Sequence, residues 1–121
     1  MNLLDFQIKV EIWVRHCFGA VVEADKIERN HRFLEEALEL VQSCGCTASE
    51  AHQLVDYVFS RPIGDKRQEL GGTLLTLSAL SSAQSILLDD AADTELIRCW
   101  QNIEKIRAKQ AAKPKHSPLP Q

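Results

Sequence analysis

One stretch of the chain constrains its fold more than any other, because no charged residue occurs between Glu69 and Asp89. A helix over roughly residues 66–85 that carries no charge after its first turn must be covered nearly all round, so we expect it at the centre of a bundle. The stretch approaches the length of a membrane span, but its glycines, threonines and serines make it too polar to insert by itself. The sequence therefore predicts the central helix of a soluble protein without a membrane partner.

The remaining sequence shows helical periodicity, no strand pattern and no internal repeat. Capping residues and chain breakers give the expected boundaries. The expected helices are one capped by Asp5 and ending near Gly19, one over residues 24–43, one from the capping box Thr47–Glu50 to about Phe59, the central helix capped by Asp65, and one that begins near Asp90 or Asp93. The predicted fold class is all-α, a four- to five-helix bundle.

Length and composition bound the domain organisation. With 121 residues, of which 45% are hydrophobic, the chain is expected to form one helical domain over residues 1–112. Residues 113–121 contain three prolines and are predicted to be an extended tail. Since Met1 leads into amphipathic sequence without a basic start, no signal peptide is predicted and the expected location is cytoplasmic.

Charge is unevenly distributed. All 17 acidic residues lie at or before Glu104, whereas five of the 14 basic residues follow it. An acidic body repels a phosphate backbone, so we expect no duplex nucleic-acid partner. If the body handles phosphates, a divalent cation has to lie between them and the carboxylates.

The four cysteines give little support to a zinc site. Cys44 and Cys46 form a single CxC pair, and even together with His52 they fall short of the four ligands of a structural zinc. We expect Cys17 and Cys99, like that pair, to be reduced and mostly buried thiols.

Acidic residues in two separate segments suggest a metal site. Glu35, Glu36 and Glu39 are spaced by three and four residues, which places them on one helical face. That face is either a site for one cation or simply the solvated side of an amphipathic helix. Glu69 is followed by Gly71 and Gly72, and paired helical glycines suggest the close approach of another helix or of a ligand.

If the two helices share a site, Glu36, Glu39 and Glu69 form an oxygen-rich pocket for Mg²⁺, with Mn²⁺ as an alternative. A di-iron bundle needs two Glu-x-x-His pairs and the chain has one, Glu28 with His31.

Two segments carry a family resemblance. Phe33–Leu40 (FLEEALEL) and Gln68–Leu75 (QELGGTLL) resemble the MazG-type branch of the all-α nucleoside triphosphate pyrophosphohydrolases, and the similarity extends from about Trp13 to Arg107. Those enzymes carry an ExxE motif and a later ExxD motif whose four acids bind magnesium. The resemblance implies cleavage of a nucleoside triphosphate into the monophosphate and pyrophosphate, by homodimers or homotetramers.

Three of the four motif acids are present in this chain. Glu36 and Glu39 match ExxE, and Glu69 matches the first acid of ExxD. Gly72 stands at the position of the aspartate, so one carboxylate is missing from the pattern. Glu35 and Asp56 are the candidates to compensate for it.

The remaining candidates have roles within such a reaction. Glu35 would orient or deprotonate the attacking water. Arg32 and Lys66 would bind phosphate, unless they are ordinary surface cations. Trp13 either stacks on a base or packs in the core, and His31 lies on the substrate side or on the polar face.

Two hypotheses follow from these residues. The leading one is a magnesium-dependent nucleotide pyrophosphohydrolase, and the rival is a non-catalytic bundle of the same fold that binds a nucleotide, a metal or a protein. Either would be completed by oligomerisation, because a thin bundle cannot cover its uncharged central helix alone.

Overall fold

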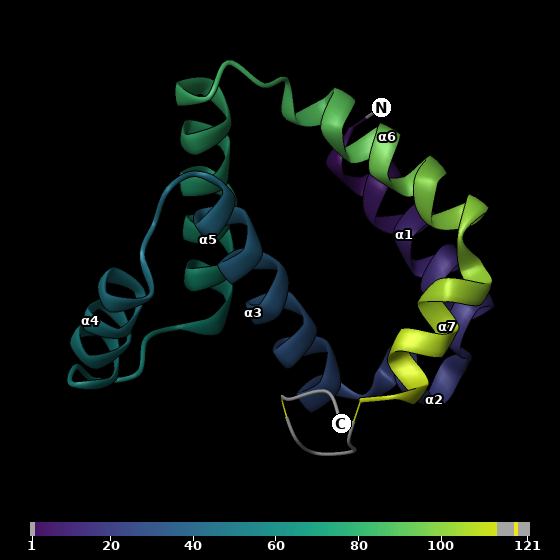
Figure 1. Ribbon diagram of the computed structural model, residues 1–121, viewed down its shortest axis with the longest axis horizontal. Helices are drawn as coiled ribbons and strands as arrows, with labels where there is room; N and C mark the ends of the chain where they lie inside the picture. Colours follow the sequence, from purple (N-terminus) through teal and green to yellow (C-terminus); the bar gives the residue numbers. More distant parts are fainter. Residues whose placement is uncertain (1, 114–117, 119–121) are drawn as a thin grey trace. The chain divides into compact units, whose positions relative to one another are not determined.

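The structure is a computed structural model that describes residues 2–113 and 118 (Figure 1). All regular structure in these residues is helical, which confirms the all-α prediction. The helices are α1 Leu3–Phe18, α2 Ala20–Ala24, α3 Lys26–Ser43, α4 Ala48–Phe59, α5 Lys66–Ala83, α6 Leu88–Gln101 and α7 Ile103–Ala111. Most of the predicted extended tail lies outside the described residues.

Local capping explains where several helices begin. The Thr47 side chain accepts a hydrogen bond from the Glu50 amide, and the Glu50 carboxylate accepts one from the Thr47 amide, which confirms the predicted capping box of α4. Asp65 accepts from the Gln68 amide at 2.9 Å and caps α5 as predicted.

Other boundaries differ from the prediction. Asn2, rather than Asp5, caps α1 and accepts a hydrogen bond from the Asp5 amide. The segment before α3 forms the separate short helix α2, because Gly19 adopts a positive φ of 86° and Asp25 caps a new helix by accepting from the Glu28 amide. An interruption at Asn102 likewise divides the last predicted helix into α6 and α7.

The chain divides into two compact units, residues 1–36 with 89–121 and residues 37–88. In the first unit α1 packs against α2 and α7. Trp13 and Cys17 are its buried apolar side chains, and the Trp13 ring meets that of Phe18 edge-on at 5.6 Å between centroids. Arg107 of α7 donates hydrogen bonds to the Cys17 and His16 carbonyl oxygens, which satisfies acceptors at the end of α1.

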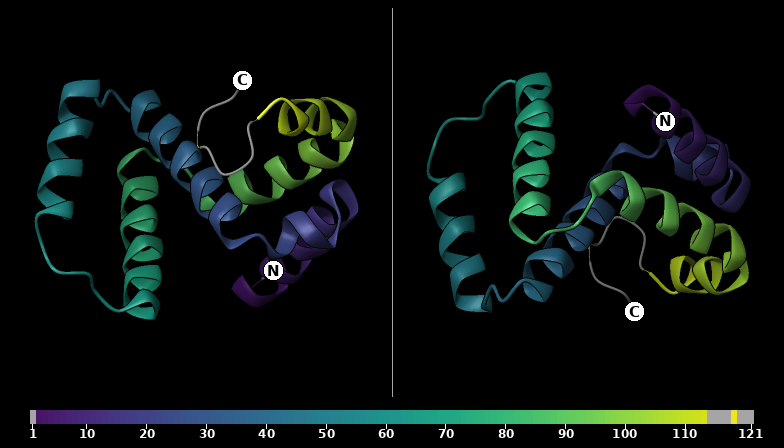
Figure 2. Two further views of the ribbon diagram at one scale, coloured as in Figure 1. Left: turned by 90° about the horizontal axis from the view of Figure 1, so that it is seen from below. Right: turned by 90° about the horizontal axis from the view of Figure 1, so that it is seen from above.

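The second unit consists of the end of α3, α4 and α5, with α4 and α5 joined by the chain around Pro62 (Figure 2). None of residues 37–88 is buried. The expected coverage of α5 is therefore not supplied within this unit, and Leu70 and Leu75 are 73% and 69% exposed. The expected burial of this helix all round is thus not met within the second unit, since composition shows the need for coverage but not what provides it.

No single helix in the described part of the chain is long and apolar enough to cross a membrane, although the bent pair α5 and α6 would pass on length and composition taken together.

Candidate functional site

Helix α3 carries four of the predicted site residues on one face. Arg32, Glu35, Glu36 and Glu39 follow one another at positions i, i+3, i+4 and i+7 of this uninterrupted helix. Residues at these spacings lie on one side of an α-helix over two turns. The predicted alignment of three carboxylates and one cation along a single face is therefore present.

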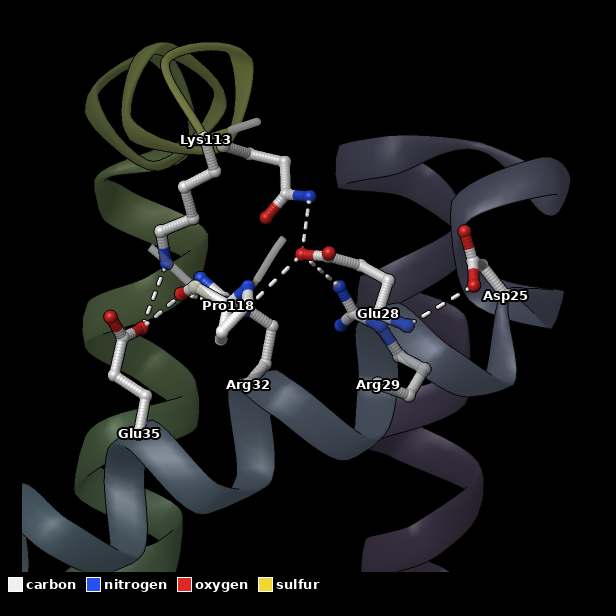
Figure 3. A network of polar contacts seen from close by, with 8 residues as sticks. Asp25, Glu28, Arg29, Arg32, Glu35, Lys113 and Pro118 are labelled. Carbon is white, nitrogen blue, oxygen red and sulfur yellow. Dashed lines mark hydrogen bonds and ion pairs between the residues drawn. The ribbon is translucent and has the colours of Figure 1, made fainter. Parts of the chain in front are cut away.

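A polar network in the first unit holds part of this face (Figure 3). Arg32 lies between two acids of its own helix, with Nε 3.3 Å from Glu28 Oε1 and Nη1 3.4 Å from Glu35 Oε1. Its third nitrogen, Nη2, donates a hydrogen bond of 2.9 Å to the Pro118 carbonyl oxygen. The Arg32 and Glu28 side chains are each only 12% exposed, so solvent screens this network less than an ordinary surface pair.

Gln110 of α7 and Lys113, which follows this helix, contribute two further contacts. Lys113 Nζ lies 2.8 Å from Glu35 Oε1, and the Gln110 side-chain amide donates a hydrogen bond of 2.9 Å to Glu28 Oε1. Lys113 is 13% exposed. Sequence reasoning missed both residues, because Gln110 carries no charge and Lys113 reads as one more basic residue of the tail.

These cations set the charge state of Glu35. The hydrogen bond from Lys113, assisted by the positive charges of Lys113, Arg32 and Lys109, lowers the pKa of this carboxyl below its ordinary 4.5 against the opposing effect of burial. Glu35 is therefore ionised at neutral pH. Such a carboxylate accepts a hydrogen bond from a water molecule and thereby orients it. Because it is a weak base, it has little tendency to take the proton of that water.

The predicted metal ligands are exposed carboxylates. Glu39 and Glu69 lie in the second unit, and neither side chain forms a hydrogen bond or an ion pair with the described residues. Glu36 is also exposed, at the edge of the first unit. Among the described residues, no group of three or more histidine, cysteine or acidic side chains is close enough to hold a metal ion.

The glycines near Glu69 have different surroundings from those expected. A Cβ atom at Gly64 would lie 2.6 Å from Glu69 Oε1, so this turn glycine leaves room for the carboxylate. By contrast, no atom lies within 4 Å of a Cβ built at Gly71 or Gly72, and the close approach inferred from these glycines is not found in the described part of the chain. The Cβ atom of an aspartate at position 72 therefore meets no neighbour in the described part of the chain.

The other candidates are scattered. Lys66 is exposed in the first turn of α5, one turn before Glu69, and Asp56 is exposed on α4. His31 on α3 is half-buried, and its Nδ1 atom has no hydrogen-bond partner among the residues that the structure describes. Trp13 is 9% exposed beside Phe18, which corresponds to the core alternative rather than to an open stacking surface.

All four cysteines are free thiols. Cys17 is buried and Cys46 and Cys99 are half-buried, but Cys44 is exposed after the end of α3, so the expectation of mostly buried thiols holds only in part.

Comparisons with protein-family models, with curated proteins and with solved structures find no match.

Proposed function

We propose that the protein is a magnesium-dependent nucleotide pyrophosphohydrolase that splits a nucleoside triphosphate between its α- and β-phosphates into the monophosphate and pyrophosphate. The observation that carries the proposal is the face of α3, on which Arg32 and three carboxylates occupy two successive turns. The resemblance of this segment and of the Glu69 segment to the MazG-type motifs gives the reaction class.

The donor set fits a hard cation. We assign Glu36, Glu39 and Glu69 as ligands, because carboxylate oxygens suit Mg²⁺ or Mn²⁺. The described residues hold no ready group of three such ligands. That is compatible with magnesium, which commonly takes one or two carboxylates and completes its octahedron with waters and substrate phosphates. When bound, the ion would neutralise triphosphate charge.

The protein residues supply binding and orientation. Glu35, which is ionised, accepts a hydrogen bond from the attacking water and so directs the oxygen of that water at the phosphorus atom. Lys66 and Arg32 contact phosphate oxygens, and on Arg32 Nη2 such an oxygen takes the place of the Pro118 carbonyl. Trp13 packs in the core, and His31 on α3 is kept as a candidate for base contact.

A homodimer or homotetramer is part of this proposal. None of residues 37–88 is buried, although they include large apolar side chains such as Phe59 and Ile63, which are 85% and 101% exposed. Exposed apolar surface of this extent marks an interaction site. In a symmetric dimer each copy of the chain would cover this surface of the other.

Pyrophosphate release from a panel of ribo- and deoxyribonucleoside triphosphates tests the activity. We expect magnesium-dependent turnover, and Glu39→Gln should reduce it to background because it removes a ligand charge while preserving shape. Glu11→Gln on α1 is the matched control and should retain full activity. No turnover by the wild-type protein across the panel would contradict the proposal.

The rival is a bundle that binds the nucleotide without cleaving it, and Gly72 favours it because the fourth motif acid is missing. Calorimetry showing magnesium-dependent binding of an intact nucleotide, without pyrophosphate, would support this rival. Gly72→Asp tests how much the missing carboxylate contributes to turnover, because a Cβ atom at this position meets no neighbour among the described residues. We expect this variant to be more active than the wild type.

A further inference from the structure

The contacts of Glu35 are unequal between its two oxygens. Lys113 Nζ and Arg32 Nη1 both approach Oε1, at 2.8 and 3.4 Å. Oε2 has no partner among the described residues, and the side chain keeps 31% exposure. One oxygen is therefore anchored while the other is available to a solvent molecule, which is the arrangement that orienting a water requires.

The Lys113 contact is one of two that join α3 to the chain at the end of α7. Glu28 and Glu35 are seven residues apart on one face of α3 and bind Gln110 of α7 and Lys113, which follows that helix. Arg32 lies between the two acids and contacts both. The contacts with Lys113 and Arg32 therefore hold the Glu35 side chain in one direction (Figure 3).

Partial burial makes Lys113 more than a surface cation. With Lys113 13% and Arg32 12% exposed, the ion pairs are shielded from solvent, and removal of Lys113 leaves Glu35 with the longer contact to Arg32 alone. Glu104 and Lys105, earlier on α7, are exposed by comparison, and Lys105 forms no ion pair with the described residues.

We propose that Lys113 is a positioning residue that holds Glu35 by one oxygen, so that the other orients the water that attacks the triphosphate. The inference rests on the proposed hydrolase and adds to it a residue outside both motif segments. It gives the start of the tail a role in the reaction, although Lys113 itself does not touch the substrate.

Lys113→Met and Lys113→Arg test this role in the full-length protein. Methionine removes the positive charge and the hydrogen bond but has a side chain of similar length to lysine. Arginine keeps the positive charge and a hydrogen-bond donor. Lys105→Met on α7 is the matched control because it removes the same charge eight residues earlier, at an exposed position. The readouts are kcat and KM with a magnesium–nucleoside triphosphate, and the free energy of unfolding in urea of Lys113→Met, Glu35→Gln and the variant that carries both changes.

In Lys113→Met we expect kcat to fall more than KM changes, because Glu35 loses the contact that directs its second oxygen. Lys113→Arg should restore kcat, and Lys105→Met should leave it as in the wild type. The losses of stability in Lys113→Met and Glu35→Gln should be less than additive in the variant that carries both changes, because each removes the same contact.

Fully additive losses of stability overturn the contact, and an unchanged kcat in Lys113→Met overturns the positioning role. Wild-type protein without turnover overturns the hydrolase and this role with it. The stability measurements then still show whether Lys113 binds Glu35, so the two failures are distinguishable.

Discussion

At the scale of single residues, Cys99 shows how surroundings decide reactivity. Burial, followed by the hydrogen bond and the negative charge of Glu95, raises the pKa of the Cys99 thiol from 9.0 to about 11. At pH 8 the thiolate fraction is then about 100-fold smaller than that of an ordinary cysteine. Cys44, in contrast, is exposed after α3.

In variants that keep a single cysteine, Cys99 is therefore expected to react with Ellman's reagent at least about 100-fold more slowly than Cys44 at pH 8. Glu95→Gln should accelerate the reaction of Cys99 and leave that of Cys44 unchanged. Equal rates for the two thiols would show that the environment of Cys99 is not as described.

At the scale of helices, the capping box of α4 should be measurable as stability. Thr47→Ala removes the acceptor of the Glu50 amide, and we expect it to lower the free energy of unfolding by about 1 kcal/mol. Urea denaturation followed by circular dichroism measures the change. Thr76→Ala is the control, because the Thr76 hydroxyl lies in the interior of α5 and caps no terminus. Equal losses in both variants would contradict a capping role.

Predictability from the sequence follows the range of the interactions. The caps at Thr47 and Asp65 were predictable because each joins residues three apart, and the alignment of Glu35, Glu36 and Glu39 follows from helical periodicity alone. The break at Asn102 has no glycine or proline to mark it.

The anchor of Glu35 was beyond prediction for a different reason. Its partner Lys113 lies 78 residues away, and only the packing of the first unit brings the two together. For the same reason, spacing within the Glu69 segment predicts an acid near the start of α5 but cannot say which side chains face it. Tertiary contacts carry that information, and no local pattern encodes them.

At the scale of the whole molecule, the lack of a buried residue in the second unit has a thermodynamic consequence. Full burial of one large apolar side chain contributes about 2 kcal/mol, and a unit without any such burial cannot offset the conformational entropy of ordering its helices. Its apolar faces on α4 and α5 therefore need coverage from outside, and the proposed second copy would supply it.

Phe59 and Val21 allow a matched test, because both are apolar and 85% exposed, one at the end of α4 and the other on α2. If the second unit forms the interface, Phe59→Asp should raise the dissociation constant of the wild-type oligomer by at least about 30-fold, since it removes about 2 kcal/mol of apolar burial and adds a charge to desolvate. Val21→Asp should leave assembly unchanged. Sedimentation velocity over a concentration series measures both, and a wild-type chain that sediments as a monomer throughout, or equal dissociation by the two variants, would exclude this surface as the contact between copies.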